Sequence, residues 1–590
     1  MYEILNKINS PKDLKKLSFE ELDELAKEIR LACLNRASEI GGHIGSNLCV
    51  AELSIALHYV FDFLKDKLVL DVSHQCYPHK ILTGRKDGFI DATKMKDISG
   101  YLAPNESEFD LFYIGHTSTS ISLGAGLAKA RDLNHEKFNV VALIGDGSLS
   151  GGEAFEGLNN IGATSTNFIV VVNDNDMGIA ENQGALANNL RELKSSKGKS
   201  KDNFFKSLGF DYIYIENGNN VKSLIEEFSK IKNINHPIVV HVNTIKGNGY
   251  DFAMSEKEKW HFRQPFDIET GELKTSSPSY DYYKLTHDFL IKKHKENKDV
   301  VVVTAATPGL CGFTQDFRDT FAERFVDVTI AEEHAVAYVS ALAKAGKRPV
   351  FGVYSSFIQR SYDQLSQELA LNNSPAIILV FKSGITAANA THLGLFDIAL
   401  TKSIPNLVCM SPSSPEEYVS MFEWAINQTS HPVVIRVPLN SIDKPVNLEV
   451  QEEKSYFPAK FETVKSGEKV CILALGKFFK LGEQLCKTLE EKHSINATLI
   501  NPIYSNILDE DTLNNLSIDH SVFVTIEDGV IDGGFGESVS RHLAKHGKIV
   551  LNFGAEREFT SNISVATLKE KFGLTTENMT SEILNALKNQ

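Results

Sequence analysis

Residues 138–175 read FNVVALIGDGSLSGGEAFEGLNNIGATSTNFIVVVNDN, with two apolar runs on either side of a helix-like stretch. Continuous runs of valine and isoleucine bounded by polar residues are typical of strands that a parallel sheet buries on both faces. Asp146 follows the first run and Asn175 follows the second, about 30 residues later, which is the length of a strand–helix–strand unit. The stretch therefore predicts an α/β fold in which both oxygen-bearing side chains emerge at the same sheet edge.

Similar apolar runs recur along the whole chain, at 236–243, 299–306 and 374–381. Two polar stretches without periodicity, 261–281 and 437–456, are typical of linkers between domains. We therefore expect three α/β domains with mostly parallel sheets, which span residues 1–280, 281–445 and 446–590.

Composition excludes several classes of function. The chain has 61 basic and 76 acidic residues, and this net charge of -15 argues against a broad nucleic-acid-binding or anionic-membrane surface. Its seven cysteines are scattered with no CxxC pair, which argues against a disulfide framework and a zinc site. No apolar run approaches the length of a membrane span, and the first residues are mixed and charged. We expect a cytoplasmic protein with neither nucleic acid nor membrane as a partner.

The residues that follow the two strands suit a metal ion and a phosphate group. Carboxylate and amide oxygens are ligands that Mg²⁺ prefers, and open α/β sheets bind ligands at this carboxyl edge. The glycines on both sides of Asp146 allow backbone N–H groups to approach a diphosphate. An aspartate that only caps a strand-to-helix turn explains the Gly-Asp-Gly motif alone about as well. Asn175 lies one strand–helix–strand unit after Asp146, and this spacing favours a binding site over a simple cap.

Longer motifs carry a family resemblance. The GDG motif with a downstream NDN resembles the thiamine diphosphate signature. Six further segments are GGHIGSNL (41–48), DVSHQCYPHKILTGRKD (71–87), GHTSTSIS (115–122), IAEEHAVA (330–337), YSSFIQRSYDQL (354–365) and EDGVIDGGFGES (527–538). They resemble the 1-deoxy-D-xylulose-5-phosphate synthase family, and this resemblance implies a transketolase-like thiamine diphosphate-binding fold, thiamine diphosphate and Mg²⁺ as cofactors, and a homodimer.

The same resemblance assigns the cofactor site residue by residue. Asp146, Asn175 and the backbone carbonyl of Met177 are expected to hold Mg²⁺. The diphosphate and the rest of the cofactor are expected to contact Gly147, Ser148, His74, Gly115, His116, Thr117, Lys246 and Tyr250.

Thiamine chemistry also requires a carboxylic group beside the aminopyrimidine ring, in a dry site. Glu332 and Glu333 both stand where a helix-like stretch begins, and either fits as a residue that merely complements the helix dipole. The family resemblance selects Glu332. It also implies that Phe357 stacks on the aminopyrimidine, for which ordinary core packing is the alternative.

Five histidines lie in glycine-rich or polar contexts, within or near the matched motifs, and not on apolar helical stripes. This placement favours proton transfer and carbonyl orientation over a purely structural role. His43, His261 and His392 are the catalytic candidates, and His74 and His116 are the other two.

A phosphorylated substrate needs a cationic clamp, for which guanidinium groups are best suited. The resemblance places Arg360, Arg436, Lys382 and Tyr354 at the substrate. A salt bridge with no functional role is the alternative for each arginine.

The acceptor pocket departs from the family pattern. The family's DGPTHQG reads ANATHLG at 388–394, so that Ala388 replaces its aspartate and Asn389 is an uncharged partner. The arginine of the family's RAG motif is Lys382, which keeps the charge but loses the bidentate fork. Leu439 removes a charge from the family's RYPRG motif. The cofactor positions are intact, so the prediction of the cofactor is firmer than that of the substrate.

These features lead to a specific functional hypothesis, the thiamine diphosphate- and Mg²⁺-dependent condensation of pyruvate with glyceraldehyde 3-phosphate. The reaction releases CO₂ and gives 1-deoxy-D-xylulose 5-phosphate. One alternative is a related ketol transferase or acyloin-forming enzyme with a different aldehyde acceptor. The other alternative is an inactive paralogue that acts as a scaffold, against which the intact Asp146, Asn175 and Glu332 argue.

Overall fold

The computed structural model describes residues 2–275, 280–439, 441–450 and 454–589. The chain forms two compact units, Met1–Ser277 with Thr329–Ala331 and Pro278–Val328 with Glu332–Gln590. Three larger sheets, mostly parallel and covered by helices, confirm the predicted α/β class. Within the described ranges, no helix combines the length and the apolar character needed to cross a membrane.

The first unit is built on a parallel sheet with the strand order β2-β3-β4-β6-β5. Side chains of β3 alternate between two cores, with Val141 and Leu143 in one and Ala142 and Ile144 in the other. Burial on both faces explains why the apolar runs in the sequence are continuous. The strands are β2 (Lys67–Leu70), β3 (Val140–Gly145), β4 (Phe168–Asp174), β5 (Asp211–Ile215) and β6 (Pro237–Asn243).

Helices of the first unit carry or flank most of the motifs noted above. They are α1 (Phe19–Ile40), α2 (Gly45–Leu48), α3 (Ala51–Val60), α4 (Tyr77–Lys80), α5 (Asp87–Ile90), α6 (Ser120–Leu133), α7 (Gly152–Gly162), α8 (Gly184–Ser195), α9 (Phe204–Ser207), α10 (Val221–Ile231) and α11 (Asp251–Ser255).

The stretch 261–281 differs from the linker that we expected. Its residues Phe262–Arg263 form β7, which pairs antiparallel with β1 (Gly42–His43), and Phe266 is fully buried in the first core. Residues 261–275 therefore pack as part of the first unit, and β7 holds the 41–48 motif through its pairing with β1. Residues 276–279 lie outside the described residues.

The second unit holds two sheets. The larger has the order β12-β13-β11-β10-β8-β9 and is parallel throughout, and the other has the order β14-β16-β15-β17-β18 with β14 antiparallel to β16. Val302 of β8 and Leu473 of β15 belong to the same core, which joins the two sheets. The three sheets fall within 1–280, 281–445 and 446–590, while the domain limits themselves stay predictions.

The strands of the second unit are β8 (Val300–Thr304), β9 (Phe325–Asp327), β10 (Arg348–Tyr354), β11 (Ile377–Phe381), β12 (Val408–Met410), β13 (Val433–Val437), β14 (Glu462–Lys465), β15 (Lys469–Ala474), β16 (Thr498–Asn501), β17 (His520–Val530) and β18 (Ile549–Ala555). Its helices are α12 (Tyr282–Glu296), α13 (Gln315–Phe321), α14 (Glu332–Lys344), α15 (Ser355–Ile358), α16 (Tyr362–Gln364), α17 (Asp397–Lys402), α18 (Pro415–Asn427), α19 (Phe479–His493), α20 (Glu510–Asp519), α21 (Phe535–Leu543), α22 (Val565–Lys571) and α23 (Thr576–Lys588).

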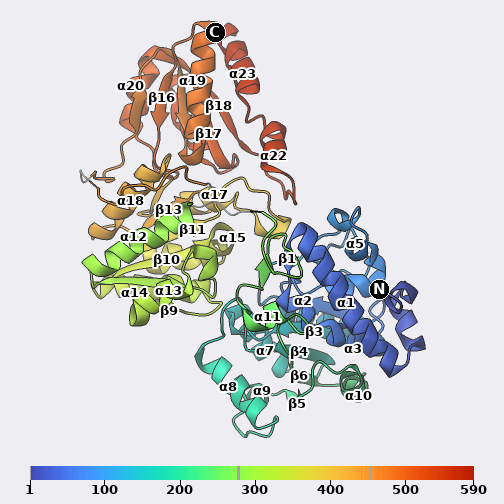
Figure 1. Cartoon of the computed structure of the whole chain (residues 1–590). Helices are drawn as coiled ribbons and strands as arrows, with labels where there is room; N and C mark the ends of the chain where they lie inside the picture. Colours follow the sequence, from blue (N-terminus) through green and yellow to red (C-terminus); the bar gives the residue numbers. More distant parts are fainter. Residues whose placement is uncertain (1, 276–279, 440, 451–453, 590) are drawn as a thin grey trace. The chain divides into compact units, whose positions relative to one another are not determined.

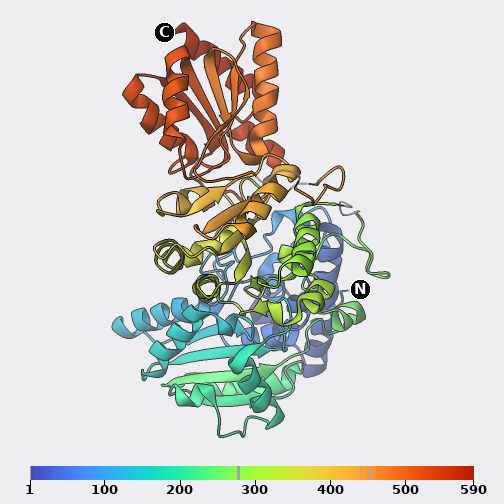
Figure 2. The ribbon, with the colours of Figure 1, turned by 90° about the vertical axis from the view of Figure 1, so that its left-hand side faces the viewer.

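Helices cover both faces of the last sheet, drawn in orange to red in Figures 1 and 2. Leu485 of α19 and Met579 of α23 pack in the core on one face. Leu513 of α20 and Val539 of α21 pack in the core on the other. This is the layered arrangement that buried parallel strands require.

Candidate active site

Asp146 and Asn175 meet at the carboxyl ends of neighbouring strands β3 and β4. The backbone N–H of Asn175 donates to Asp146 Oδ2 over 3.1 Å, and that of Gly147 donates to Oδ1 over 2.9 Å. Asn175 Oδ1 is buried and accepts no hydrogen bond in the described parts of the chain. Burial, together with the neighbouring Asp174, raises the pKa of Asp146 well above its ordinary value.

The Asn175 amide oxygen accepts no hydrogen bond in the described residues, and burial disfavours the charged form of the neighbouring Asp146 carboxylate. Two such oxygens are suitable ligands for a hard cation. The residues present therefore fit Mg²⁺. The loop after β4 carries Met177, which forms an isolated bridge with Glu181. Across the described residues, no group of three or more His, Cys, Asp or Glu side chains is placed to hold a metal.

Gly147 lies where two loops approach closely. A Cβ at this position would stand 2.8 Å from the Cα of Gly178 and 3.2 Å from Oδ1 of Asn182. Real Cβ atoms essentially never come within 3.0 Å of another heavy atom, so the approach needs glycine. The loop that carries Gly147 and the loop that carries Met177 and Gly178 are thus packed backbone to backbone.

The GHTSTSIS motif is tied to the same region. The backbone N–H groups of Ser118 and Ser120 donate to the buried carboxylate of Asp71, over 2.8 and 2.9 Å. The Ser118 hydroxyl donates to the carbonyl of Ser148 over 2.7 Å. These bonds hold the loop that carries Gly115, His116 and Thr117 beside Ser148.

Three predicted histidines form a cluster in the first unit. The ring centroid of His43 lies 5.1 Å from that of His74 and 5.4 Å from that of His261, and the last two rings are 5.3 Å apart. Burial first, and then nearby cationic groups, place the pKa values of His43 and His261 well below the ordinary value. Both rings are therefore neutral at pH 7, so that each has one donor and one acceptor nitrogen.

Lys246 and Tyr250 stand on the loop before α11. The Lys246 ammonium donates to the carbonyl of Gly178 and lies 3.4 Å from His261 Nδ1. Burial lowers the pKa of Lys246 to about 8. Tyr250 packs edge-on against Trp260, and its hydroxyl donates to a backbone carbonyl over 2.8 Å. Lys246 thus joins the histidine cluster to the loop that carries Met177 and Gly178. Tyr250 instead packs with aromatic side chains.

Asn47 is a site residue that sequence reasoning missed. Its Nδ2 donates to the carbonyls of His43 and His74, over 2.9 and 2.8 Å, and its Oδ1 accepts from the N–H of Tyr77 over 2.9 Å. The side chain is fully buried. One amide therefore fixes both histidine loops. Asn47 lies inside the 41–48 motif, but nothing in the sequence separates it from an ordinary surface asparagine.

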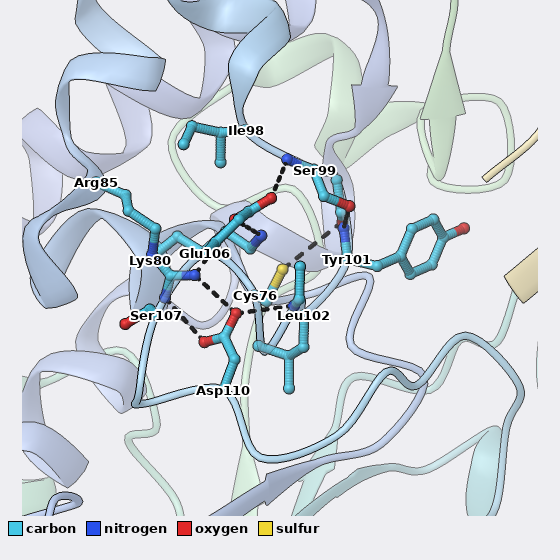
Figure 3. A network of polar contacts seen from close by, with 12 residues as sticks. Cys76, Lys80, Arg85, Ile98, Ser99, Tyr101, Leu102, Glu106, Ser107 and Asp110 are labelled. Atoms are coloured by element: carbon cyan, nitrogen blue, oxygen red, sulfur yellow. Dashed lines mark hydrogen bonds and ion pairs between the residues drawn. The ribbon is translucent and has the colours of Figure 1, made fainter. Parts of the chain in front are cut away.

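Tyr101 is a second residue that was missed. Its ring lies 5.7 Å from that of His43. Buried ion pairs hold its loop, with Lys80 2.6 Å from Glu106 and Arg85 2.7 Å from Asp110. Figure 3 shows Tyr101 directed away from these pairs.

The acidic residues of these pairs also anchor the backbone of the Tyr101 loop. Glu106 accepts from the N–H of Ser99 over 2.7 Å (Figure 3). Asp110 accepts from the N–H of Ala103 over 2.9 Å. Lys80 and Arg85 of the 71–87 motif thus help to position this loop.

In the second unit, Glu332 begins α14 with a buried side chain. Its Oε2 has no hydrogen-bond partner in the described ranges. Burial raises the pKa of Glu332 to about 7, although the charge of Arg360 acts to lower it. Glu333 is half-buried, so burial separates the two residues that the sequence alone left equivalent.

The aromatic and cationic candidates of this unit gather at the ends of β10 and β11. The ring of Phe357 stacks on Tyr354 at 5.8 Å and meets the edge of His392 at 5.6 Å. The Lys382 ammonium stands 5.5 Å above the Tyr354 ring, and burial lowers the pKa of Lys382. Arg360 acts on the charge of Glu332.

Arg436 lies apart from this pattern, in a buried ion-pair network. Its guanidinium donates to both oxygens of Asp397, over 2.8 and 3.1 Å, and to Asp528 over 2.6 Å. Lys477 also pairs with Asp528, at 3.1 Å, and donates to the carbonyl of Ser383. The geometry favours a structural role for Arg436 over the predicted contact with substrate. Asp528 and Lys477 were not among the predicted site residues.

Three family models match successive parts of the chain. The family model for 1-deoxy-D-xylulose-5-phosphate synthase matches residues 5–201 and 194–244, that for the transketolase pyrimidine-binding domain matches 279–443, and that for the transketolase C-terminal domain matches 459–579.

Curated relatives match over the full length. The 1-deoxy-D-xylulose-5-phosphate synthase of Clostridium acetobutylicum is 36% identical and aligns over 99% of this chain and 100% of its own. That of Lachnoclostridium phytofermentans is 38% identical over 99% of each chain. Among solved structures, a transketolase variant from Pichia stipitis is 15% identical, covering 97% of this chain and 98% of its own with a TM-score of 0.45. Given the full-length relatives, the chain belongs to the 1-deoxy-D-xylulose-5-phosphate synthase family.

Proposed function

We propose that the chain condenses pyruvate with glyceraldehyde 3-phosphate, with loss of CO₂, to give 1-deoxy-D-xylulose 5-phosphate. Membership of the family makes it a transketolase-like transferase that depends on thiamine diphosphate. We further propose that it requires Mg²⁺ and acts as a cytoplasmic homodimer.

The buried carboxyl group of Glu332 is the observation that carries the proposal. With a pKa raised to about 7 and an Oε2 that has no hydrogen-bond partner in the described residues, this group holds a proton near neutral pH. It is therefore able to donate that proton to a ring nitrogen of the aminopyrimidine. When bound, thiamine diphosphate supplies the carbon nucleophile for the pyruvate ketone and accepts the electrons released with CO₂.

The first unit supplies the groups that suit the diphosphate end. Asp146 and Asn175, with the backbone carbonyl of Met177, would hold Mg²⁺, as the unpartnered Asn175 oxygen supports. Gly147 and Ser148 would present backbone groups to the diphosphate. Mg²⁺ held there would offset the negative charge of the diphosphate.

Neutral histidines support the proton transfers that the condensation needs. The pyruvate ketone oxygen gains a proton on addition and must give it up again when the product ketone forms, while the aldehyde oxygen gains a proton as it becomes a hydroxyl group. The burial of His43 and His261 keeps both rings uncharged, so each is able to donate at one nitrogen and accept at the other. We assign His43, His261 and His392 to these steps.

Lys382 and Arg360 support a phosphate at the other end of the aldehyde. Both are half-buried, and they stand near Tyr354 and Glu332 respectively. Lys382 forms no ion pair with a carboxylate in the described residues, whereas Arg436 pairs with two, and Arg360 acts on the charge of Glu332. A phosphate dianion would compensate for the Lys382 charge, with Arg360 as a second cation.

The proposal is tested by incubating the protein with Mg²⁺, thiamine diphosphate, pyruvate and a panel of aldehydes. Release of CO₂ should rise when glyceraldehyde 3-phosphate is added, with 1-deoxy-D-xylulose 5-phosphate as the product. If another aldehyde stimulates release and glyceraldehyde 3-phosphate does not, the substrate assignment is wrong.

A different aldehyde acceptor is the second candidate, and two residues favour keeping it in the panel. Ala388 is buried and has no polar group, and Lys382 replaces a bidentate guanidinium with a point charge. The scaffold alternative is tested separately by calorimetry. Normal binding of thiamine diphosphate with no turnover on any substrate would support it.

A further inference from the structure

His392 is held through a short chain of hydrogen bonds that starts at Asn389. Asn389 Oδ1 accepts from the backbone N–H of Thr391 over 3.2 Å and from the Thr391 hydroxyl over 2.9 Å. Thr391 Oγ1 in turn lies 2.8 Å from His392 Nδ1. The three residues belong to one tight turn, since the N–H of His392 donates to the carbonyl of Asn389 over 2.8 Å.

The direction of each hydrogen in this chain follows from the donors available. The backbone N–H of Thr391 faces the Asn389 side chain, so the atom that it meets must be the amide oxygen and not the NH₂ group. An amide oxygen only accepts, so the single hydrogen of the Thr391 hydroxyl points to Asn389. The hydroxyl oxygen is then left with lone pairs toward His392.

An acceptor at this place requires a hydrogen on His392 Nδ1. In the neutral ring, Nε2 is then the nitrogen that accepts a proton. The ring plane is also restricted, because the imidazole packs against the Phe357 ring in a T-shaped arrangement, with centroids 5.6 Å apart and an interplanar angle of 75°. The turn therefore sets both the tautomer and the orientation of the imidazole.

We propose that Thr391 and Asn389 are positioning residues that hold His392 as its Nδ1–H tautomer and present Nε2 to the substrate. The contact of His392 with substrate rests on the proposed function, whereas the tautomer rests on the geometry of the turn alone. This chain of hydrogen bonds carries no charge. A hydroxyl and an amide orient the imidazole here, a task that a carboxylate performs in many catalytic sites.

Nitrogen-15 NMR of the full-length protein tests the tautomer directly. The signal of His392 is identified by its loss in His392→Gln, and its two ring nitrogens report which one carries the proton. We expect Nδ1–H in the wild type and in Thr391→Ser, which keeps the hydroxyl. We expect a mixture of tautomers in Thr391→Val, which keeps the shape and loses the hydroxyl.

Kinetics give the second readout. Loss of one orienting hydrogen bond should lower kcat of Thr391→Val by about tenfold with little change in the KM for pyruvate, and Thr391→Ser should restore it. Equal thermal midpoints for the two variants exclude misfolding as the cause.

Two results would overturn the inference, namely a wild-type His392 with the proton on Nε2, or a Thr391→Val protein whose tautomer matches that of the wild type. If the wild type has the expected tautomer but no turnover with pyruvate and glyceraldehyde 3-phosphate, the proposed function fails and the positioning role stands.

Discussion

Arg436 and Asp528 lie 2.6 Å apart and join two sheets of the second unit, since Arg436 stands on β13 and Asp528 on β17. Burial opposes ionisation of the carboxyl group, but the charges of Arg436 and Lys477 outweigh it and lower the pKa of Asp528 to about 2. Asp397 completes the neutralisation of the guanidinium. This buried ion pair thus links the larger parallel sheet to the last sheet.

Replacing Arg436 with methionine should destabilise the second unit strongly. Buried Asp397 would lose its ion-pair partner and Asp528 would keep only Lys477, and breaking such a network costs about 3–5 kcal/mol of unfolding free energy. Urea unfolding measures the loss. Lys454→Met is the matched control, because its pair with Glu462 is exposed and contributes under about 1 kcal/mol. An unchanged stability with a raised KM for the phosphorylated aldehyde would instead support the predicted phosphate contact.

Glu332→Gln should abolish turnover and leave cofactor binding almost intact. An amide keeps the shape but cannot transfer the proton, so kcat should fall by at least about a hundredfold. Calorimetry with thiamine diphosphate and Mg²⁺ should give an affinity within a few-fold of the wild type. Glu333→Gln is the control, since its half-buried position assigns it no such role. Equal loss in both variants would contradict the assignment.

Glu332 should also leave a signature in the pH dependence of stability without cofactor. Its pKa is raised by folding from about 4.5 to about 7, so its contribution is fully present below about pH 4.5 and is lost as the pH rises through 7. Glu332→Gln lacks this loss. Relative to the wild type, the thermal midpoint of the variant should therefore rise between about pH 5 and about pH 8.

Glu527 has the same direction of shift as Glu332, with a pKa raised to about 7, but it titrates in both proteins and cancels in the difference. A difference between variant and wild type that does not change with pH would show that Glu332 ionises normally.

Asn175→Ala should remove the dependence of cofactor binding on Mg²⁺. The variant loses an oxygen that has no hydrogen-bond partner in the described residues, so folding should be little affected. Calorimetric titration of thiamine diphosphate with and without Mg²⁺ gives the readout. The exposed Asn217→Ala is a matched control and should keep the Mg²⁺ effect. If Asn175→Ala keeps it too, the metal site lies elsewhere.

Tyr101 offers a test of the loop that Figure 3 shows. Tyr101→Ala removes the ring beside His43 and should lower kcat by about tenfold through looser placement of that imidazole. Tyr101→Phe keeps the packing and should retain activity. Glu106→Gln weakens the tie to Lys80 and should reproduce the defect more mildly. Full activity of Tyr101→Ala would assign the ring to packing alone.

The sequence predicted the sheets well because strands that are buried on both faces consist of continuous apolar runs, as at 138–145 and 374–381. It predicted the meeting of Asp146 and Asn175 because parallel strands place their carboxyl ends at one edge. Neither inference needs knowledge of distant contacts.

Other features depend on contacts between distant residues, which no local pattern encodes. Asn47 joins two loops, and the partners of Arg436 lie 39 and 92 positions away in Asp397 and Asp528. The choice of Glu332 over Glu333 likewise depends on burial of one side chain. The polar stretch 261–281 predicts a linker, since nothing in its local pattern indicates that its residues Phe262–Arg263 (β7) pair with β1.

Lys382 provides the sharpest test of the substrate. Its ammonium stands above the Tyr354 ring, and burial favours its neutral form by lowering its pKa, so a phosphate dianion would compensate for the buried charge. Lys382→Ala should therefore raise the KM for glyceraldehyde 3-phosphate at least tenfold, about the effect of one charged hydrogen bond. The KM for unphosphorylated glyceraldehyde should hardly change, and Lys382→Arg should recover most of the affinity. Equal changes for both aldehydes would place Lys382 away from the phosphate and direct the search toward Arg360.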